Sequence, residues 1–254
     1  MSKNITITGQ RGGSGKSITA VNLAASLALM EKRTLLLDVD PQKSATDWSG
    51  IKDKTDVRDI SSVLGGLAPI SEAILNTELN FLDVLPSGFE LFKAEAKFRK
   101  NAENIKLLRL ILEEVGSDYD YIIIDPPSSY GFLSLMGLAA ADWLLVSMSL
   151  PNGSFDDLHC LLQVVKDLKS SHKLPLKIAG ILFNQCRSKK ELEAFLEKQS
   201  LTDAKGLVFD NFIPDDEFIR KAIDMKIPAA LNNVKNPGAA AFLNFALEID
   251  SFLR

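Results

Sequence analysis

Cysteine and histidine are scarce in this chain. Its 254 residues include two histidines and two cysteines, and the cysteines, Cys160 and Cys186, lie 26 positions apart. This spacing gives neither a disulfide framework nor a zinc-ligand pattern. We therefore interpret both cysteines as small buried apolar side chains in a reducing cytosol.

Long apolar runs are also missing. No stretch is long enough to span a bilayer, and the N-terminal apolar run is too short for a signal peptide. The apolar C-terminal segment 239–249 carries Glu248, with Asp250 beside it, where a membrane-surface helix has Lys and Arg. We expect this segment to pack against a sheet, and we expect a cytoplasmic protein that makes no membrane contact.

The chain has no excess of positive charge, since its formal net charge is −4. This balance argues against a surface that is basic all over. A local basic patch remains possible, because phosphate binding depends on where the charges lie. No linker, repeat or low-complexity tract divides the sequence, so we expect one domain over residues 1–254.

What the chain does contain is a glycine-rich motif at residues 10–17, with the sequence QRGGSGKS. An apolar/polar alternation precedes it, and a helix-compatible segment follows it. The glycines let backbone N–H groups turn toward an anion, and a helix N-terminus adds unpaired donors. In such a loop Lys16 reaches the β- and γ-phosphates, and the Ser17 hydroxyl binds Mg²⁺. Although Gln10 replaces the first glycine of the usual motif, this context indicates a nucleotide site.

Apolar runs separated by helical patterns predict the fold. We expect strands at 4–8, 34–40, 81–85, 121–124, 143–148 and 178–183, and helical segments at 16–30, 105–115 and 158–168. Strands that alternate with helices imply right-handed crossovers and a parallel sheet. The sequence therefore predicts an α/β fold with a doubly wound, mostly parallel sheet and helices on both faces, as in P-loop NTPases.

Three acids follow predicted strands. Asp38 and Asp40 end one of them, and Asp125 ends another. Ligands of a doubly wound sheet bind at the carboxyl ends of its strands. An acid after an apolar strand next to a phosphate loop is a usual way to hold Mg²⁺ or its water, so we assign Asp125 to the metal.

Several blocks of the sequence together resemble a known family. They are residues 11–17 (RGGSGKS), 20–24 (AVNLA), 38–42 (DVDPQ), 85–87 (LPS), 125–128 (DPPS), 138–142 (LAAAD), Asn184 and residues 213–214 (IP). The pattern covers essentially the whole chain. It is similar to the ParA/Soj/MinD family of ATPases with a deviant Walker A loop, and most of all to short plasmid-partition or cargo-positioning ParA proteins.

The resemblance implies an ATPase, slow unless stimulated, with ATP and Mg²⁺ as ligands. It implies a homodimer that sandwiches two nucleotides, binds DNA without sequence preference and so associates with the nucleoid, and is stimulated by a ParB-like or other adaptor protein. Carried over by position, Asp40 orients or activates the attacking water, Asp38 orders the switch around the metal, and Asn184 and Pro214 meet the adenine. The implied nucleotide-binding residues are Arg11, Gly12, Gly13, Ser14, Gly15, Lys16, Ser17, Ile18, Asn184 and Pro214.

Arg11 departs from the family, which has a lysine there that crosses the dimer interface to the partner's ATP. Arg keeps the charge and adds a planar fork of donors that suits a phosphate. We expect Arg11 to bridge to the partner's nucleotide and to contribute to catalysis together with Lys16 and Asp40. The alternative is that Arg11 points to solvent or to its own phosphates and that dimerisation is weak.

For DNA binding the sequence offers scattered basic residues. Candidates are Arg187, Lys189, Lys190, Arg220 and Lys221. From residue 151 onward, however, 14 basic residues are balanced by 14 acidic ones, so a solvated surface is the simpler interpretation. We expect weak, ATP-dependent and non-specific DNA binding.

Two other functional classes stay open. The first is a nucleotide-locked dimeric scaffold in which hydrolysis is incidental. The second is a small-molecule kinase or synthetase with the same fold, which needs an acceptor pocket. The sequence shows no convincing set of residues for such a pocket.

Overall fold

The computed structural model describes residues 2–9, 12–51, 58–153, 155–198 and 205–254. Within them, seven strands form one sheet in the order β3-β4-β2-β5-β1-β6-β7. The strands are β1 (Lys3–Thr8), β2 (Thr34–Asp38), β3 (Leu75–Asn76), β4 (Leu82–Leu85), β5 (Tyr121–Asp125), β6 (Trp143–Ser149) and β7 (Lys177–Asn184). All neighbouring strands run parallel except the short edge strand β3, which is antiparallel to β4.

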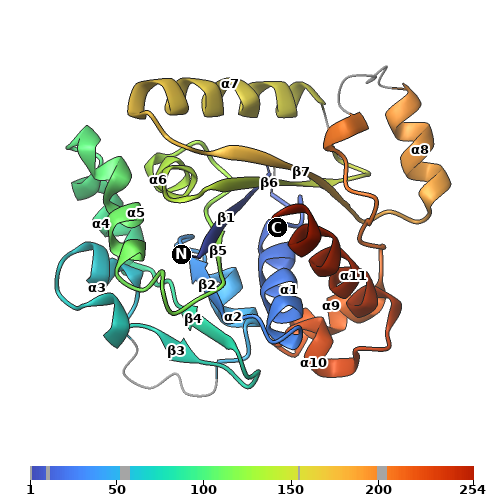
Figure 1. The fold of residues 1–254 in the computed structure, drawn as a ribbon, viewed down its shortest axis with the longest axis horizontal. Helices are drawn as coiled ribbons and strands as arrows, with labels where there is room; N and C mark the ends of the chain where they lie inside the picture. Colours follow the sequence, from blue (N-terminus) through green and yellow to red (C-terminus); the bar gives the residue numbers. More distant parts are fainter. Residues whose placement is uncertain (1, 10–11, 52–57, 154, 199–204) are drawn as a thin grey trace.

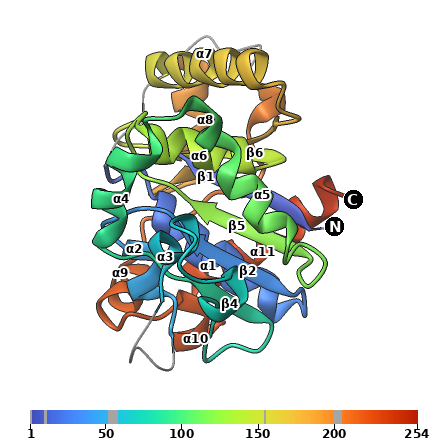
Figure 2. The same cartoon turned by 90° about the vertical axis from the view of Figure 1, so that its left-hand side faces the viewer.

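Helices cover both faces of this sheet (Figure 1). They are α1 (Lys16–Leu29), α2 (Ser44–Trp48), α3 (Ile60–Leu64), α4 (Glu90–Phe98), α5 (Leu107–Glu113), α6 (Phe132–Ala140), α7 (Phe155–His172), α8 (Lys189–Lys198), α9 (Glu217–Asp224), α10 (Ala229–Asn233) and α11 (Pro237–Phe252). In Figure 2, α7 lies above strands β1 and β5, and α10 lies below them. In Figure 1, α5 and α6 lie to the left of these two strands, and α1 and α11 lie to their right. The predicted mostly parallel α/β architecture is confirmed.

Successive side chains of each central strand enter opposite cores. On β5, Ile123 belongs to the core under α1 and α11, whereas Ile122 and Ile124 belong to the core under α5, α6 and α7. Leu36 and its neighbours on β2 divide in the same way. Because side chains alternate across a strand, a continuous apolar run is what a strand with two buried faces requires.

The expected packing of the C-terminal segment 239–249 against the sheet is also confirmed. Within α11, Phe242, Phe245 and Ile249 are buried in the core that contains α1. Among the described residues, we find no helix long and apolar enough to cross a membrane.

Some predicted boundaries are wrong. The strand expected at 34–40 ends at Asp38, so Asp40 lies in the loop beyond it. The segment expected to be helical at 105–115 begins as a 3₁₀ turn, Ala102–Lys106, before α5. Cys186 is buried as expected, but Cys160 is exposed, because the apolar stripe of α7 lies on its other face and buries Leu158 and Leu161.

Candidate active site

Residues 12–15 form a turn between β1 and α1. Gly13 and Gly15 have φ angles of 82° and 86°, in the left-handed region that favours glycine. Gly15 directly precedes α1, and no side chain of the described residues caps the start of this helix. The first N–H groups of α1 therefore have no intrahelical acceptor and are available to an anion.

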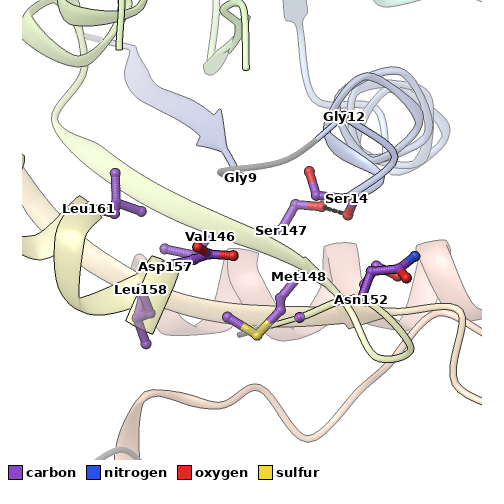
Figure 3. A pocket seen from close by; sticks show the side chains of 12 residues that line it. Gly9, Gly12, Ser14, Val146, Ser147, Met148, Asn152, Asp157, Leu158 and Leu161 are labelled. Atoms are coloured by element: carbon purple, nitrogen blue, oxygen red, sulfur yellow. Dashed lines mark hydrogen bonds between the residues drawn. The ribbon is translucent and has the colours of Figure 1, made fainter. Parts of the chain in front are cut away.

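Side chains of the two neighbouring strands β6 and β7 position this loop through hydrogen bonds. Ser147 on β6 donates a hydrogen bond to the Ser14 carbonyl oxygen at 2.7 Å, and the Asn184 side chain on β7 donates to Ser147 Oγ at 2.9 Å. Figure 3 shows the small cavity between the loop, β6 and α7, with Ser14, Ser147 and Asp157 on its walls. A Cβ at Gly9 would lie 2.4 Å from Ser14 Oγ, so this packing excludes a side chain there.

A second cavity, of about 400 Å³, borders this loop and the first residues of α1. It brings together residues from four segments of the sequence: Gly13, Gly15, Lys16, Ser17, Ile18, Asp40, Gln42, Ser44, Trp48, Ser128 and Gln185. Lys16 Nζ donates to Ser128 Oγ at 2.8 Å. Burial lowers the pKa of Lys16, and the negative charges of Asp125 and Asp40 oppose this effect.

Two acids are buried beside this cavity. Asp38 and Asp125 are partners in the β2–β5 register. One Asp38 oxygen accepts from the Asp40 N–H at 3.0 Å, and the other accepts from the N–H and hydroxyl of Thr46, both at 2.8 Å. Burial raises the pKa of Asp38, and these hydrogen bonds act in the opposite direction.

Asp125 has no such support. Its side chain is fully buried, and within the described residues neither carboxylate oxygen accepts a hydrogen bond of normal geometry, although the Ser17 hydroxyl lies close enough to lower the Asp125 pKa. Burial, followed by the charge of Asp38, raises the Asp125 pKa. Two buried carboxylates, one of them without a donor, are a site that a cation would stabilise.

The donor set fits Mg²⁺ rather than a metal held by protein alone. Within the described parts of the chain, no group of three or more His, Cys, Asp or Glu side chains could hold a metal ion. Mg²⁺ keeps several waters and is usually bound by one or two carboxylates together with phosphate oxygens. Asp125, Asp38 and the Ser17 hydroxyl at the cavity wall could supply this small protein share.

Asp40 lies on the wall of the same cavity as Lys16 and Ser17. Its backbone N–H is fixed on Asp38, and one of its carboxylate oxygens accepts from the Gln42 N–H at 2.9 Å. The side chain is half-buried. Asp40 is therefore oriented by local hydrogen bonds next to the space that a phosphate would enter.

A third cavity, of about 90 Å³, also adjoins the loop. Its walls are Gly15, Ile18, Asn184, Gln185, Ile213, Pro214, Asp215, Asp216, Ile219 and Arg220. Asn184 and Pro214, the predicted adenine contacts, thus meet beside Gly15 and Ile18. The Asn184 amide already bonds Ser147 and, at 3.4 Å, the Thr19 hydroxyl. Its contact with adenine stays a prediction.

The candidate DNA-binding residues divide into two groups. Arg187, Lys189 and Lys190 are exposed around the start of α8. Arg220 pairs with Asp215 at 2.5 Å, and Lys221 pairs with Glu217 at 3.0 Å. These two cations are thus partly neutralised, and the DNA-binding role of all five residues stays a prediction.

Arg11 lies outside the described residues, as does Gln10. The expected contact of Arg11 with a partner's nucleotide therefore stays a prediction. Gly12 and Ser14, by contrast, are described and line the cavity behind the loop.

No role was predicted for several residues that the fold brings to this site. Thr46 joins Asp38 to the Ser87 N–H, which donates to the Thr46 hydroxyl at 2.9 Å. Gln185 lies on the walls of both cavities with a left-handed φ of 59°. Ser128 follows the Asp-Pro-Pro segment, and this position was its only sequence signal.

Comparison with known proteins identifies relatives over nearly the full length. The family model described as an AAA domain matches residues 2–178. The chromosome partitioning protein ParA of Myxococcus xanthus is 34% identical over 96% of this chain and 87% of its own length. The sporulation initiation inhibitor protein Soj of Bacillus subtilis is 32% identical over 98% of each chain.

A solved structure extends the likeness to the fold. Cobyrinic acid a,c-diamide synthase from Mycobacterium smegmatis, solved with bound ADP and magnesium, has a TM-score of 0.82 and 26% identity to this chain. The match covers 100% of this chain and 95% of that one.

Proposed function

The chain belongs to the ParA/Soj family of chromosome-partitioning ATPases, and from this premise we propose that ATP binding and hydrolysis around Lys16 switch the protein between two association states. In the ATP state it forms a homodimer that binds DNA without sequence preference. A partner protein then stimulates hydrolysis, and the dimer releases the DNA. This cycle positions or segregates DNA or another cargo.

One observation carries the proposal: Lys16, Ser17 and Asp40 border a single cavity at the open start of α1. The backbone donors and Lys16 suit a triphosphate, and Asp40 offers a carboxylate on the same wall. Mg²⁺, when bound, would neutralise phosphate charge, and Ser17, Asp38 and Asp125 would hold the ion at the cavity. The solved relative described above binds ADP and magnesium, which supports this assignment.

In the proposed reaction, water attacks the γ-phosphorus and ADP leaves. Asp40 accepts a hydrogen bond from that water and orients it, and Lys16 stabilises the charge on the transferred group. Lys16 must exchange its hydrogen bond to Ser128 for a phosphate oxygen when ATP enters. Ser128 would thereby be released only in the nucleotide-bound state.

The first test is the molar mass of Asp40→Ala in MgATP and in MgADP, measured by light scattering. Removal of the carboxylate that orients the water should trap the ATP state, so the mass is expected to double in MgATP only. Asp47→Ala is the matched control: it removes an acid from α2 that pairs with Lys43 and does not line the cavity. The control should hydrolyse ATP and return to its starting mass.

Other results would favour the other classes. If Asp40→Ala stays monomeric in both nucleotides, the two-state switch is refuted. If it dimerises but wild-type hydrolysis never changes the mass, the protein is a nucleotide-locked scaffold. Phosphate transfer to a small acceptor, with no response to DNA or partner, would identify a metabolic enzyme.

A further inference from the structure

The second and third cavities share a polar side chain, that of Gln185. This residue borders both the cavity of about 400 Å³, which contains Lys16, and the cavity of about 90 Å³, which contains the predicted adenine contacts. The other residues that line both are Gly15, which has no side chain, and Ile18, whose side chain is apolar. Among the described residues, Gln185 therefore supplies the one hydrogen-bonding side chain at this junction.

The two cavities correspond to the two ends of a nucleotide. In the proposed function the phosphates occupy the cavity with Lys16, and the base occupies the cavity with Pro214. The ribose connects phosphates and base in every nucleotide. A side chain that borders both cavities is thus placed to contact the sugar.

The backbone holds Gln185 in an uncommon conformation. Its φ angle of 59° lies in the left-handed region, which residues with a Cβ seldom adopt. On one side of it, the Asn184 carbonyl oxygen accepts from the Leu150 N–H at 2.8 Å. On the other side, the Cys186 N–H donates to the Ile213 carbonyl oxygen at 3.1 Å. Strained residues that the surrounding structure holds in place cluster at ligand sites, so this conformation points to a role for the Gln185 side chain.

A hydrogen bond also orients the Gln185 amide. The hydroxyl of Ser149, at the end of β6, donates to the Gln185 side-chain carbonyl oxygen. Ser149 is buried, whereas Gln185 is exposed. A glutamine amide has one acceptor oxygen and an NH₂ group with two donors. Because Ser149 occupies the oxygen, the NH₂ group is what this side chain offers to a ligand.

The neighbouring Asn184 is engaged differently. Its NH₂ group already donates to Ser147 Oγ at 2.9 Å and to the Thr19 hydroxyl at 3.4 Å. These bonds connect β7 with β6 and α1, so the Asn184 amide has a structural function in the absence of any ligand. The Gln185 amide, by contrast, is anchored through its oxygen alone.

We propose that Gln185 selects the sugar of the nucleotide, an assignment that rests on the proposed function and deepens it. The Gln185 NH₂ group donates a hydrogen bond to a ribose hydroxyl, and Ser149 is a positioning residue that orients this group. The preferred ligand is therefore a ribonucleotide, and the nucleotide that lacks the contacted hydroxyl binds more weakly.

The test is calorimetry with the magnesium complexes of ADP, 2′-deoxy-ADP and 3′-deoxy-ADP. Diphosphates are used because they exclude hydrolysis and the proposed ATP-dependent dimer. A hydrogen bond between neutral groups contributes about threefold to tenfold in affinity. Wild type should therefore bind ADP more tightly than one of the two deoxynucleotides by about this factor.

Gln185→Met replaces the amide with an apolar side chain of similar length. It should lose about threefold to tenfold in affinity for ADP and bind the discriminated deoxynucleotide as wild type does, so that the affinity ratio falls to about one. Ser149→Ala keeps the amide and removes its anchor, and it should lower the same ratio in part. The ratio is informative because a general defect of the fold weakens the binding of all three nucleotides alike.

The matched control is Gln42→Met. Gln42 lines the cavity with Lys16 but not the third cavity, and its hydrogen bond to Asp40 comes from the backbone N–H, which the substitution retains. This variant should keep the wild-type ratio between ADP and the deoxynucleotides. Loss of the ratio in Gln42→Met, with the ratio intact in Gln185→Met, would overturn the proposal.

Three other results would overturn it as well. The first is a wild-type ratio in Gln185→Met, and the second is an equal loss of affinity for all three nucleotides in that variant. The third is that Gln185→Met changes the preference for ADP over GDP and leaves the ratio between ADP and the deoxynucleotides unaltered, because Gln185 would then contact the base.

The proposed function and the role of Gln185 can fail separately. If wild type binds neither MgADP nor MgATP, the proposed function is refuted, and the role of Gln185 with it. If wild type doubles its mass in MgATP but binds ADP and both deoxynucleotides equally well, the proposed function stands and the role of Gln185 is wrong.

Discussion

Thr46 provides the sharpest test of how the site is held together. Its hydroxyl donates to the buried Asp38 carboxylate at 2.8 Å and accepts from the Ser87 N–H at 2.9 Å. The side chain is only 8% exposed, so water cannot replace either bond without rearrangement. Thr46→Val keeps the shape of the side chain and removes both hydrogen bonds.

The expected loss follows from these two contacts. A buried N–H left without an acceptor costs about 1–3 kcal/mol, and a lost hydrogen bond to a charged group costs about 1.5–3 kcal/mol. We therefore expect Thr46→Val to lower the free energy of unfolding by about 3 kcal/mol or more. Thr46→Ser retains the hydroxyl and loses one methyl group, which costs about 0.8 kcal/mol.

The assay is urea unfolding of wild type, Thr46→Val and Thr46→Ser, without nucleotide and with a chelator. Under these conditions ligand binding cannot contribute to stability. Comparable m-values are required, so that the midpoints report stability alone. If the valine and serine variants unfold at the same urea concentration, the hydrogen bonds from Thr46 to Asp38 and from Ser87 to Thr46 do not contribute to the free energy of unfolding, and the reasoning is refuted.

Two further predictions concern the loop and the far end of the sheet. Gly15→Ala should abolish nucleotide binding measured by calorimetry. Gly15 has a φ angle of 86°, and a new Cβ would lie 3.0 Å from the Asn184 side chain. Unaltered nucleotide binding would contradict the assigned loop geometry. Burial raises the pKa of Asp250, but hydrogen bonds from Tyr121 and Arg254 outweigh it and hold that pKa below its ordinary value. The ionised group therefore stabilises the fold above the unfolded-state pKa of about 3.9, and this contribution is lost as pH falls through the lower folded value. Urea midpoints of wild type and Asp250→Asn should differ at neutral pH and converge toward about pH 3. A difference between the two midpoints that stays the same at every pH would contradict the stabilising role of ionised Asp250.

Much of the fold could be predicted because its signals are local and repeated. The runs at 121–124 and 143–148 are apolar at every position or nearly so, and they became strands buried on both faces. Elements without such periodicity were missed. The edge strand β3 has two residues, and its place is set by antiparallel pairing with β4 rather than by its own sequence.

The same division applies to the site. Lys16, Ser17, Asp38 and Asp125 could be located because a phosphate loop and acids at strand ends leave patterns within a few residues. Thr46, Ser128 and Gln185 could not, since each matters only through a partner far away in sequence. Lys16 and Ser128, for example, are 112 positions apart and form a hydrogen bond.

By itself the sequence predicted the phosphate loop, the alternation of the central strands with helices, and the family, because backbone conformation and burial periodicity are encoded between near neighbours. Only the tertiary structure decided which carboxylate lacks a donor and which cations are already paired. Among the described residues, Asp125 has no donor of normal hydrogen-bond geometry and Arg220 is paired, and both follow from what packs around them. Such pairing depends on the distance between side chains from separate elements, which a one-dimensional pattern does not contain.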